Sequence, residues 1–407
     1  MTFNFDQRID RRHSDSLKWH KYAGQDILPL WVADTDFRSP ERIIEAIKAR
    51  VDHGVFGYGD KPQGLIAALI ARCASRYHWQ VDPEWVVVLP GVVCGLNLSV
   101  RAFTQPPQGT VAPLPIYPPF RSAAKLAERD QLSLPLILQD GRWVMDLSAA
   151  EGKMQDKKLL MLCNPQNPGG TVYRREELEA QLAFAQQHDL IVCSDEIHCD
   201  LLLTQGLQHI PFASLSDDAA RRSVTLLSPS KTFNIAGLGA SVAIIPDPAL
   251  RERFNAVRQG IVPSVDILAL VAAEVAWRDN DDWLDAQLDY LRGNRDWLVE
   301  QVNALPGLSM VSPEGSYLGW IDASALPVAS PALYFEKYGL GFSPGRDFGD
   351  DRFVRINFGC PRALLEEAAK RLKRAVDALG KTAHWPRSLP GSTGETLSWF
   401  PRRLLRG

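Results

Sequence analysis

Short apolar runs alternate with longer amphipathic stretches through the middle of the chain. Apolar runs of this length, bounded by Gly, Pro or Asp, are typical of buried strands in a parallel sheet. Several of them are separated by segments with helical spacing of apolar residues, such as 176–188. We predict strands at 85–89, 110–114, 159–163, 190–194, 223–228 and 241–245. This alternation indicates an α/β fold with a mostly parallel sheet that is covered by helices on both faces.

The last third of the chain has a different pattern. Residues 281–305 carry Trp, Leu and charged residues at helical spacing, which predicts one long helix leading into a second domain. Beyond it we expect strands at 317–321 and 353–358 and a closing helix at 363–378. We therefore expect a large domain at 46–280 and a smaller α+β domain made of 1–45 and 281–383. Residues 384–407 are rich in Pro, Gly and Ser and then basic. We expect them to form a mobile tail, and an ordered strap that packs Trp385 or Trp399 on the body is the alternative.

The composition excludes several classes of protein. With 407 residues, 45% hydrophobic and 23% charged, the chain has the composition of an ordinary globular protein of two domains. A net charge of −3 argues against an electrostatic nucleic-acid binder. No apolar stretch reaches the roughly 18 residues that span a bilayer, and the amino terminus lacks a signal pattern. The six cysteines form no CxxC pair, which favours free thiols in the cytoplasm over a metal site or a disulfide framework.

A lysine lies where the predicted strand at 223–228 ends. The run Ser228-Pro-Ser-Lys-Thr-Phe-Asn234 delivers Lys231, between small hydroxyl residues, to the start of a Gly-containing loop. Partial burial there would lower the pKa of the amine and suit a nucleophile that forms a Schiff base with a carbonyl cofactor. Ser228 and Ser230 could donate to a phosphate beside it. An ordinary strand end would also explain the lysine.

Two further strand ends carry polar side chains. Asp195 follows the apolar run at 190–194, where a carboxylate could keep a pyridine nitrogen protonated. Asn167 lies in a Pro/Gly-rich turn after the strand at 159–163 and could donate to a phenolate oxygen. Taken singly, the first could be a helix cap and the second a structural turn. The order Asn167, Asp195, Lys231, each at a predicted strand end, favours one shared site.

This combination resembles the fold-type I enzymes that depend on pyridoxal 5'-phosphate (PLP), in the aminotransferase class I/II group. Within that group the chain resembles the MalY/PatB-type carbon–sulfur β-lyases from about residue 3 to about residue 380. The resemblance rests on five segments: Ser16-Leu-Lys-Trp19, Leu30-Trp-Val-Ala-Asp-Thr-Asp-Phe37, Asp195-Glu-Ile-His198, Ser228-Pro-Ser-Lys-Thr-Phe-Asn234 and Arg355-Ile-Asn-Phe-Gly-Cys-Pro-Arg362.

The resemblance implies a role for each candidate residue around the cofactor. Lys231, Asp195 and Tyr117 would be catalytic, with the Tyr117 ring stacked on the pyridine. The turn Pro90-Gly-Val-Val93 follows a strand and opens a helix, which makes an anion site. The implied phosphate and ring contacts are Gly91, Val92, Val93, Ser228, Ser230, Asn167 and His198, together with Tyr58 donated by the partner subunit of a homodimer.

Two differences from related enzymes bear on these roles. In related enzymes an arginine eight residues after the lysine contacts the phosphate, and Gly239 occupies that position here. The phosphate would therefore depend more on the other contacts. His198 stands where many aminotransferases have a tyrosine, and this favours the β-lyase branch. For an amino-acid substrate, Arg355 matches the residue that clamps the α-carboxylate, with a backbone contact from Ala33 nearby.

The implied reaction is the β-elimination of a sulfur leaving group from cystathionine, djenkolate or another cysteine S-conjugate. An aminotransferase would use the same residues except His198. A PLP-binding regulatory protein with incidental lyase activity is a third interpretation, and any regulation would act through protein contacts because no DNA-binding segment is evident.

Overall fold

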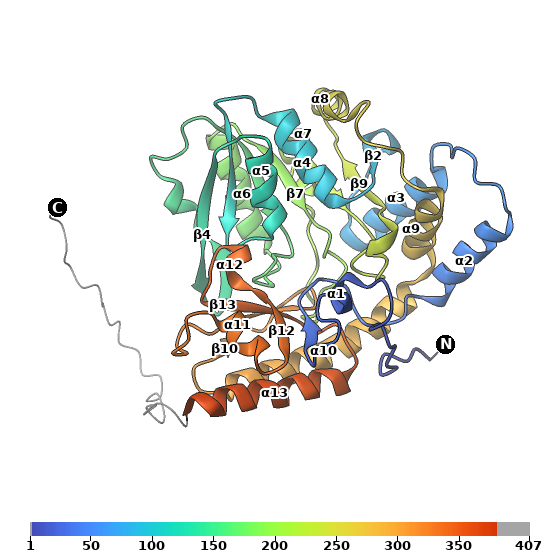
Figure 1. Ribbon diagram of the computed structural model, residues 1–407. Coiled ribbons are helices and arrows are strands. Elements are labelled where there is room, and N and C mark those ends of the chain that lie inside the picture. Colours follow the sequence, from blue (N-terminus) through green and yellow to red (C-terminus); the bar gives the residue numbers. More distant parts are fainter. Residues whose placement is uncertain (1, 381–407) are drawn as a thin grey trace.

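The structure is a computed structural model that describes residues 2–380 (Figure 1). The tail predicted at 384–407 lies outside the described residues. Among the described residues, no helix is both long and apolar enough to cross a membrane. Two sheets organise the chain, one of eight strands and one of five.

The larger sheet has the strand order β2-β9-β8-β7-β6-β3-β4-β5. Its central strands β8, β7, β6, β3 and β4 run parallel, whereas β9 is antiparallel to both neighbours and β5 is antiparallel to β4. The strands are β2 Val86–Leu89, β3 Gly109–Leu114, β4 Gln131–Gln139, β5 Arg142–Met145, β6 Lys157–Cys163, β7 Ile191–Asp195, β8 Ser223–Leu227 and β9 Ser241–Ile244.

Both faces of the larger sheet are buried. Along β6, Leu159 and Met161 belong to one apolar cluster, and Leu160 and Leu162 belong to another. The first cluster packs under α4 (Val92–Phe103), α5 (Pro118–Leu126) and α8 (Pro248–Arg258). The second packs under α6 (Arg175–Gln187) and α7 (Asp217–Arg221). A strand buried on both faces reads as a continuous apolar run, which is the pattern seen in the sequence.

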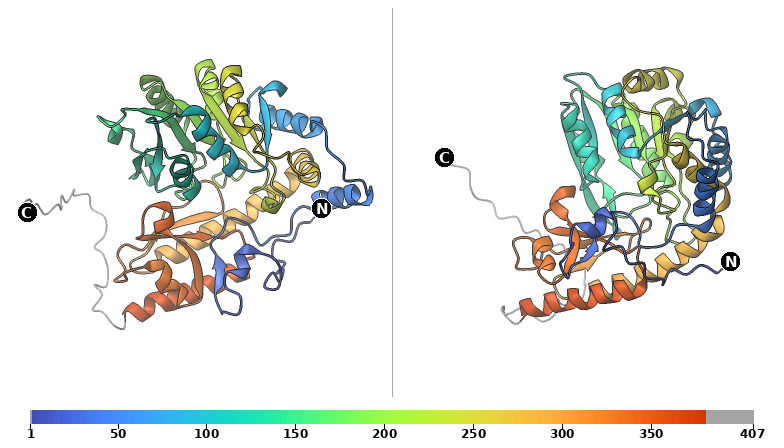
Figure 2. Two further views of the ribbon diagram at one scale, coloured as in Figure 1. Left: turned by 45° about the horizontal axis from the view of Figure 1, so that its top comes forward. Right: turned by 45° about the vertical axis from the view of Figure 1, so that its right-hand side comes forward.

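The smaller sheet has the order β1-β12-β13-β11-β10 and is mostly antiparallel. It pairs the amino-terminal segment with the last third of the chain, because β1 lies parallel to β12. The strands are β1 Leu28–Leu30, β10 Ser309–Met310, β11 Leu318–Asp322, β12 Leu340–Pro344 and β13 Phe353–Asn357. Figure 2 shows the long helices α10 and α13 running along the outer side of this sheet.

The remaining helices complete the body. Helices α2, α3 and α9 pack together beside the β2–β9 end of the larger sheet (Figure 1). The other helices are α1 Leu17–His20, α2 Glu41–Asp52, α3 Gln63–Tyr77, α9 Ile267–Asp279, α10 Asp281–Asn303, α11 Pro331–Glu336, α12 Gly345–Phe348 and α13 Arg362–Gly380.

The predicted fold class is confirmed. All six strands predicted for the large sheet are present within a few residues, as are the long helix at 281–305 and the closing helix at 363–378. The pattern did not reveal β4 and β5, which form the edge of the sheet. Since β4 is half exposed and interrupted by Pro135, it lacks the continuous apolar run of the central strands.

Candidate functional site

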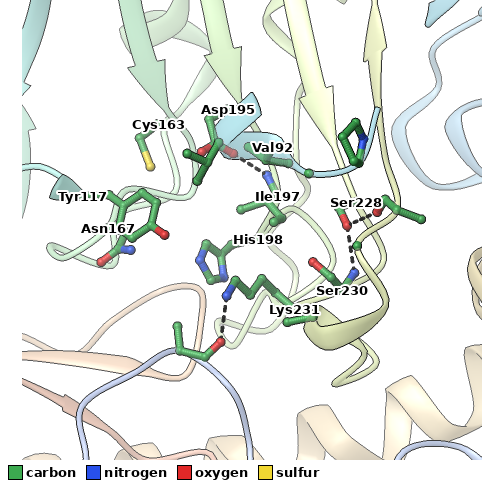
Figure 3. A pocket seen from close by; sticks show the side chains of 17 residues that line it. Val92, Tyr117, Cys163, Asn167, Asp195, Ile197, His198, Ser228, Ser230 and Lys231 are labelled. Carbon is green, nitrogen blue, oxygen red and sulfur yellow. Dashed lines mark hydrogen bonds between the residues drawn. The ribbon is translucent and has the colours of Figure 1, made fainter. Parts of the chain in front are cut away.

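A cavity of about 200 Å3 lies at the carboxyl ends of the parallel strands. Figure 3 shows the side chains that converge on it from the ends of β6, β7 and β8 and from the turn before α4. The segment before α2 adds Ala33. The cavity is lined by Ala33, Pro90, Gly91, Val92, Val93, Tyr117, Cys163, Asn167, Asp195, Ile197, His198, Ser228, Ser230, Lys231, Ala236, Gly239 and Ala240. Every candidate residue except Tyr58 and Arg355 therefore reaches one space.

Lys231 points into this cavity from the loop after β8. Its Nζ donates to the backbone carbonyl of Ala33 at 2.8 Å (Figure 3). Burial, assisted by the positive charge of Arg355, lowers the pKa of the amine to about 8, although Asp34 and Asp195 oppose the shift. A free amine is thus accessible close to neutral pH, as a nucleophile or a proton acceptor requires.

Asp195 is the last residue of β7 and is almost completely buried. One carboxylate oxygen accepts the backbone N–H of Ile197 at 3.1 Å. Burial raises the pKa of the carboxyl to about 7, and the negative charge of Glu196 adds to the effect. A cationic ring nitrogen placed opposite would favour the ionised form, because an opposite charge lowers the pKa of a buried acid.

His198 and Tyr117 face the same cavity. Burial, with the positive charges of Lys231 and Arg355, lowers the pKa of His198 to about 3, so its imidazole is neutral. The Nδ1 atom of this ring is buried and has no hydrogen-bond partner. Burial raises the pKa of Tyr117, whose backbone N–H donates to the carbonyl of Asn167 at 3.1 Å. The unpartnered Nδ1 of His198 in the cavity wall is therefore suited to bind a ligand atom.

Arg355 comes from β13 of the smaller sheet and is buried beside Asn167. Its Nη1 donates to Asn167 Oδ1 at 3.0 Å and its Nη2 to the Trp31 carbonyl at 2.7 Å. The guanidinium carbon lies 4.6 Å from the ring centre of Phe348, and Nε has no partner. Burial lowers the pKa of Arg355 to about 10, which leaves it a cation at neutral pH. It adds one positive charge for an anionic ligand group.

The turn before α4 forms the other end of the cavity. Gly91 is the N-cap of this twelve-residue helix, and Val92 and Val93 form its first turn. The backbone N–H groups of a first turn have no intrahelical partner, and the helix dipole adds positive potential. Gly239 lies opposite with a φ of +53°, and a Cβ there would lie 3.0 Å from the Pro90 carbonyl. The backbone at this position therefore strains any side chain, an arginine included.

The two serines behave differently from one another. Ser228 Oγ donates to the Ala240 carbonyl at 2.7 Å and accepts the backbone N–H of Ser230 at 3.1 Å. Its hydroxyl proton is thus committed within the protein, and a bond from it to a phosphate would break the bond to Ala240. Ser230 lines the cavity beside Lys231 (Figure 3).

Tyr58 does not reach the cavity of its own chain. It is fully exposed in the segment between α2 and α3, next to Phe56 and Val55, which are also exposed. Tyr58 could contact this cavity only in a second copy of the chain.

Sequence reasoning missed the residues that fix the Ala33 segment. Asn234 Oδ1 accepts the Thr35 N–H at 3.1 Å, Asn357 Nδ2 donates to the Val32 carbonyl at 2.8 Å, and Tyr317 Oη donates to the Ala33 carbonyl at 3.1 Å. The two asparagines lie within recognisable motifs. No local pattern marks Tyr317, which reads as an ordinary strand residue.

Comparisons with known proteins identify the family. Residues 25–372 match the family model of aminotransferase class I and II. The chain is 40% identical to cystathionine beta-lyase PatB of Bacillus subtilis (strain 168), over 92% of this chain and all of that protein. It is 32% identical to Protein MalY of Escherichia coli (strain K12), over 93% of this chain and all of that protein.

Solved structures agree with this assignment. The structure of OvoB matches with a TM-score of 0.91 and 68% identity, over 92% of this chain and 99% of that one. Cystalysin from Treponema denticola, which contains a pyridoxal 5'-phosphate cofactor, matches with a TM-score of 0.89 and 32% identity, over 93% of this chain and all of that one.

The chain belongs to the aminotransferase class I and II family and has its fold-type I architecture. Within that family it is of the PatB/MalY type.

The lowered pKa of Lys231 predicts unusual reactivity. In cofactor-free protein, half of the Lys231 amines should be unprotonated near pH 8. By contrast, Lys48 is exposed and its pKa is raised by the hydrogen bond to Glu45. A brief pulse of acetic anhydride at several pH values, followed by peptide mass spectrometry, should label Lys231 at lower pH than Lys48. Identical labelling curves for the two lysines would contradict the assignment of a perturbed amine.

Proposed function

We propose that this chain is a PLP-dependent carbon–sulfur β-lyase that acts on cystathionine or another cysteine S-conjugate and releases a thiol, pyruvate and ammonia. The observation that carries the proposal is the convergence of Asn167, Asp195 and Lys231 on one cavity, with Arg355 hydrogen-bonded to Asn167 beside it. The 40% identity to a cystathionine β-lyase over almost the whole chain supports the same activity.

The residues of the cavity fit PLP. The first turn of α4, with Gly91, Val92 and Val93, would hold the phosphate. Asp195 would pair with the pyridine nitrogen, and the Tyr117 ring would stack on the pyridine. The amide of Asn167 and the unpartnered Nδ1 of His198 would face the phenolate oxygen. Lys231 supplies the amine for the aldehyde carbon, and Ser228 and Ser230 flank the phosphate end.

When bound, PLP supplies an electron sink for the pair left at Cα of an amino-acid substrate. Arg355 would clamp the α-carboxylate, exchanging its bond to the Trp31 carbonyl for two parallel bonds to the ligand. The Lys231 amine would take the Cα proton, since its pKa of about 8 suits a base near neutral pH. Asp195, ionised opposite a protonated ring nitrogen, would keep the electron sink effective.

The products follow from the balance of bonds. The Cβ–S bond breaks and the sulfur leaves with the electron pair, taking up a proton to become a thiol. The remaining three-carbon fragment takes up water and leaves as pyruvate and ammonia. The same proton abstraction would serve an aminotransferase, which the family match keeps as the second candidate.

We further propose that the enzyme is a cytoplasmic homodimer with shared sites. The exposed run Val55, Phe56 and Tyr58 is apolar, and such surfaces mark interfaces. Tyr58 of one chain would then contact the phosphate end of the cavity of the other.

All six cysteines are unpaired, as expected in a reducing compartment. The large domain would comprise 46–280, and the small domain 1–45 and 281–383.

Product analysis separates the lyase from the aminotransferase. Purified protein incubated with cystathionine and no added keto acid should form pyruvate, ammonia and homocysteine in equal amounts over many turnovers. An aminotransferase would leave the Cβ–S bond intact, so without a keto acid it would form the oxo acid of cystathionine at no more than one equivalent per site, and no pyruvate. Omission of cystathionine is the control. No pyruvate, with the oxo acid of cystathionine formed at no more than one equivalent per site, would contradict the lyase assignment.

Subunit mixing tests the shared site. Lys231→Ala and Tyr58→Phe proteins should each be poorly active. A heterodimer of the two has one site with Lys231 and Tyr58 both intact, so it should regain up to half the activity per dimer. Mixing Lys231→Ala with Asp195→Ala is the matched control. Lys231 and Asp195 line the same chain's cavity, so each site of that heterodimer carries one of the two changes and the mixture should stay inactive.

A verified Lys231→Ala/Tyr58→Phe heterodimer that stays as inactive as its parents would place Tyr58 outside the neighbouring site.

A further inference from the structure

The segment from Trp31 to Phe37 presents its backbone carbonyls to fixed side-chain donors. Asn357 Nδ2 donates to the carbonyls of residues 32 and 34 at 2.8 and 2.6 Å. Asn234 Nδ2 donates to those of residues 35 and 37 at 3.1 and 2.9 Å. Asn234 follows Lys231 in the lysine segment, whereas Asn357 follows Arg355 on β13. This segment is therefore tied to both parts of the site through its main chain.

The Ala33 carbonyl of this segment accepts the Lys231 amine. It accepts Lys231 Nζ at 2.8 Å and Tyr317 Oη at 3.1 Å. The Tyr317 side chain is completely buried, and its ring lies edge-on to His198 with ring centres 6.1 Å apart. One carbonyl thus joins the lysine that lines the cavity to a tyrosine that does not.

Backbone hydrogen bonds fix the chain at Tyr317 and at the residues before it. Its backbone carbonyl accepts the Phe358 N–H at 2.9 Å, and the preceding Ser316 N–H donates to the Leu201 carbonyl at 2.8 Å. The backbone N–H groups of Glu314 and Gly315 both donate to the Gly170 carbonyl, at 2.9 and 3.1 Å.

Ion pairs reinforce the same segment. The Glu314 carboxylate accepts Arg142 Nε at 3.0 Å, Arg174 Nη2 at 2.6 Å and the backbone N–H of Val172 at 2.9 Å. The segment 314–317 is therefore bonded both to the loop that carries Asn167 and to the loop that follows His198. These bonds fix the position of the Tyr317 backbone. A side chain supported in this way can fix the position of a group it bonds.

We propose that Tyr317 is a positioning residue for Lys231. Its hydroxyl holds the Ala33 carbonyl in place as the acceptor for the Lys231 amine whenever that amine is not bonded to the cofactor. This inference rests on the proposed function, in which substrate frees the lysine and the lysine then takes the Cα proton. One N–H of the freed amine donates to Ala33, and this bond fixes the direction of the nitrogen lone pair.

The hydroxyl can be removed without disturbing the rest of the segment. Tyr317→Phe keeps the ring and its contact with His198, and the flanking carbonyls remain bonded to Asn357 and Asn234. Tyr173 provides a matched control, because it is also almost completely buried and its hydroxyl has no hydrogen-bond partner. Tyr173→Phe thus removes a buried hydroxyl and no hydrogen bond.

The first measurement follows proton abstraction alone. Exchange of the Cα proton of L-alanine, which has no leaving group at Cβ, is recorded by NMR in D2O with the holoenzyme. Tyr317→Phe should lower the exchange rate at saturating alanine about tenfold, the effect of one hydrogen bond, and change the half-saturating concentration less than about twofold. Tyr173→Phe should match the wild type in both.

The second measurement uses cofactor-free protein and the acetylation pulse described above. A fixed carbonyl that accepts an N–H stabilises the protonated amine. Loss of the tyrosine hydroxyl should therefore move the labelling curve of Lys231 to lower pH, with no shift in Tyr173→Phe. A merely structural role would lower thermal stability and leave this curve unchanged.

An alanine exchange rate or a Lys231 labelling curve equal to that of the wild type in Tyr317→Phe would overturn the proposal. Absence of Cα exchange in the wild type would overturn it as well. Pyruvate release from cystathionine by the wild type tests the lyase assignment separately, since alanine exchange does not require a Cβ–S bond.

Discussion

The register of three parallel strands determines where the chemistry of this protein can occur. Cys163 of β6 pairs with Asp195 of β7, and Asp195 pairs with Leu226 of β8. Because the strands run in the same direction and end together, the loops that follow them open into one space. Asn167, Asp195 and Lys231 are far apart in sequence and meet only through this alignment. A shift of β7 by one residue in register would turn the Asp195 side chain away from the cavity and into an apolar cluster.

Burial then adjusts each group to a different protonation state. It lowers the pKa of Lys231 to about 8 and that of His198 to about 3, and it raises that of Asp195 to about 7. The cavity thus contains the Lys231 amine, which can lose its proton near neutral pH, and the neutral imidazole of His198. It also contains the Asp195 carboxyl, which a nearby cation would keep ionised. The smaller sheet contributes the charge of Arg355, which the ring of Phe348 supports from one side. A strongly perturbed set of this kind is typical of a site that does chemistry.

The sequence predicted the α/β class, the central strands and the residues at their carboxyl ends, because buried parallel strands are continuous apolar runs that stop abruptly at polar residues. It did not predict β4 and β5, whose half-exposed pattern lacks that signal. The hydrogen bond from the Ser228 hydroxyl to Ala240 depends on a residue twelve positions away, just before the neighbouring strand β9, and spacing does not reveal it. Tyr317 was missed for the same reason, since its partner Ala33 is distant in the chain and bonded through its backbone. Tyr58 is exposed in the single chain, and its contact with the site of a second copy stays a prediction.

The central claim is that Lys231 is the covalent attachment point of PLP. Borohydride reduction of the purified holoenzyme, followed by proteolysis and mass spectrometry, tests it most directly. We expect the phosphopyridoxyl group on the peptide that contains Lys231, at close to one per chain, and none on the same peptide from the Lys231→Ala protein. A phosphopyridoxyl group on another lysine, or reduced protein that releases all its cofactor on denaturation, would contradict the account.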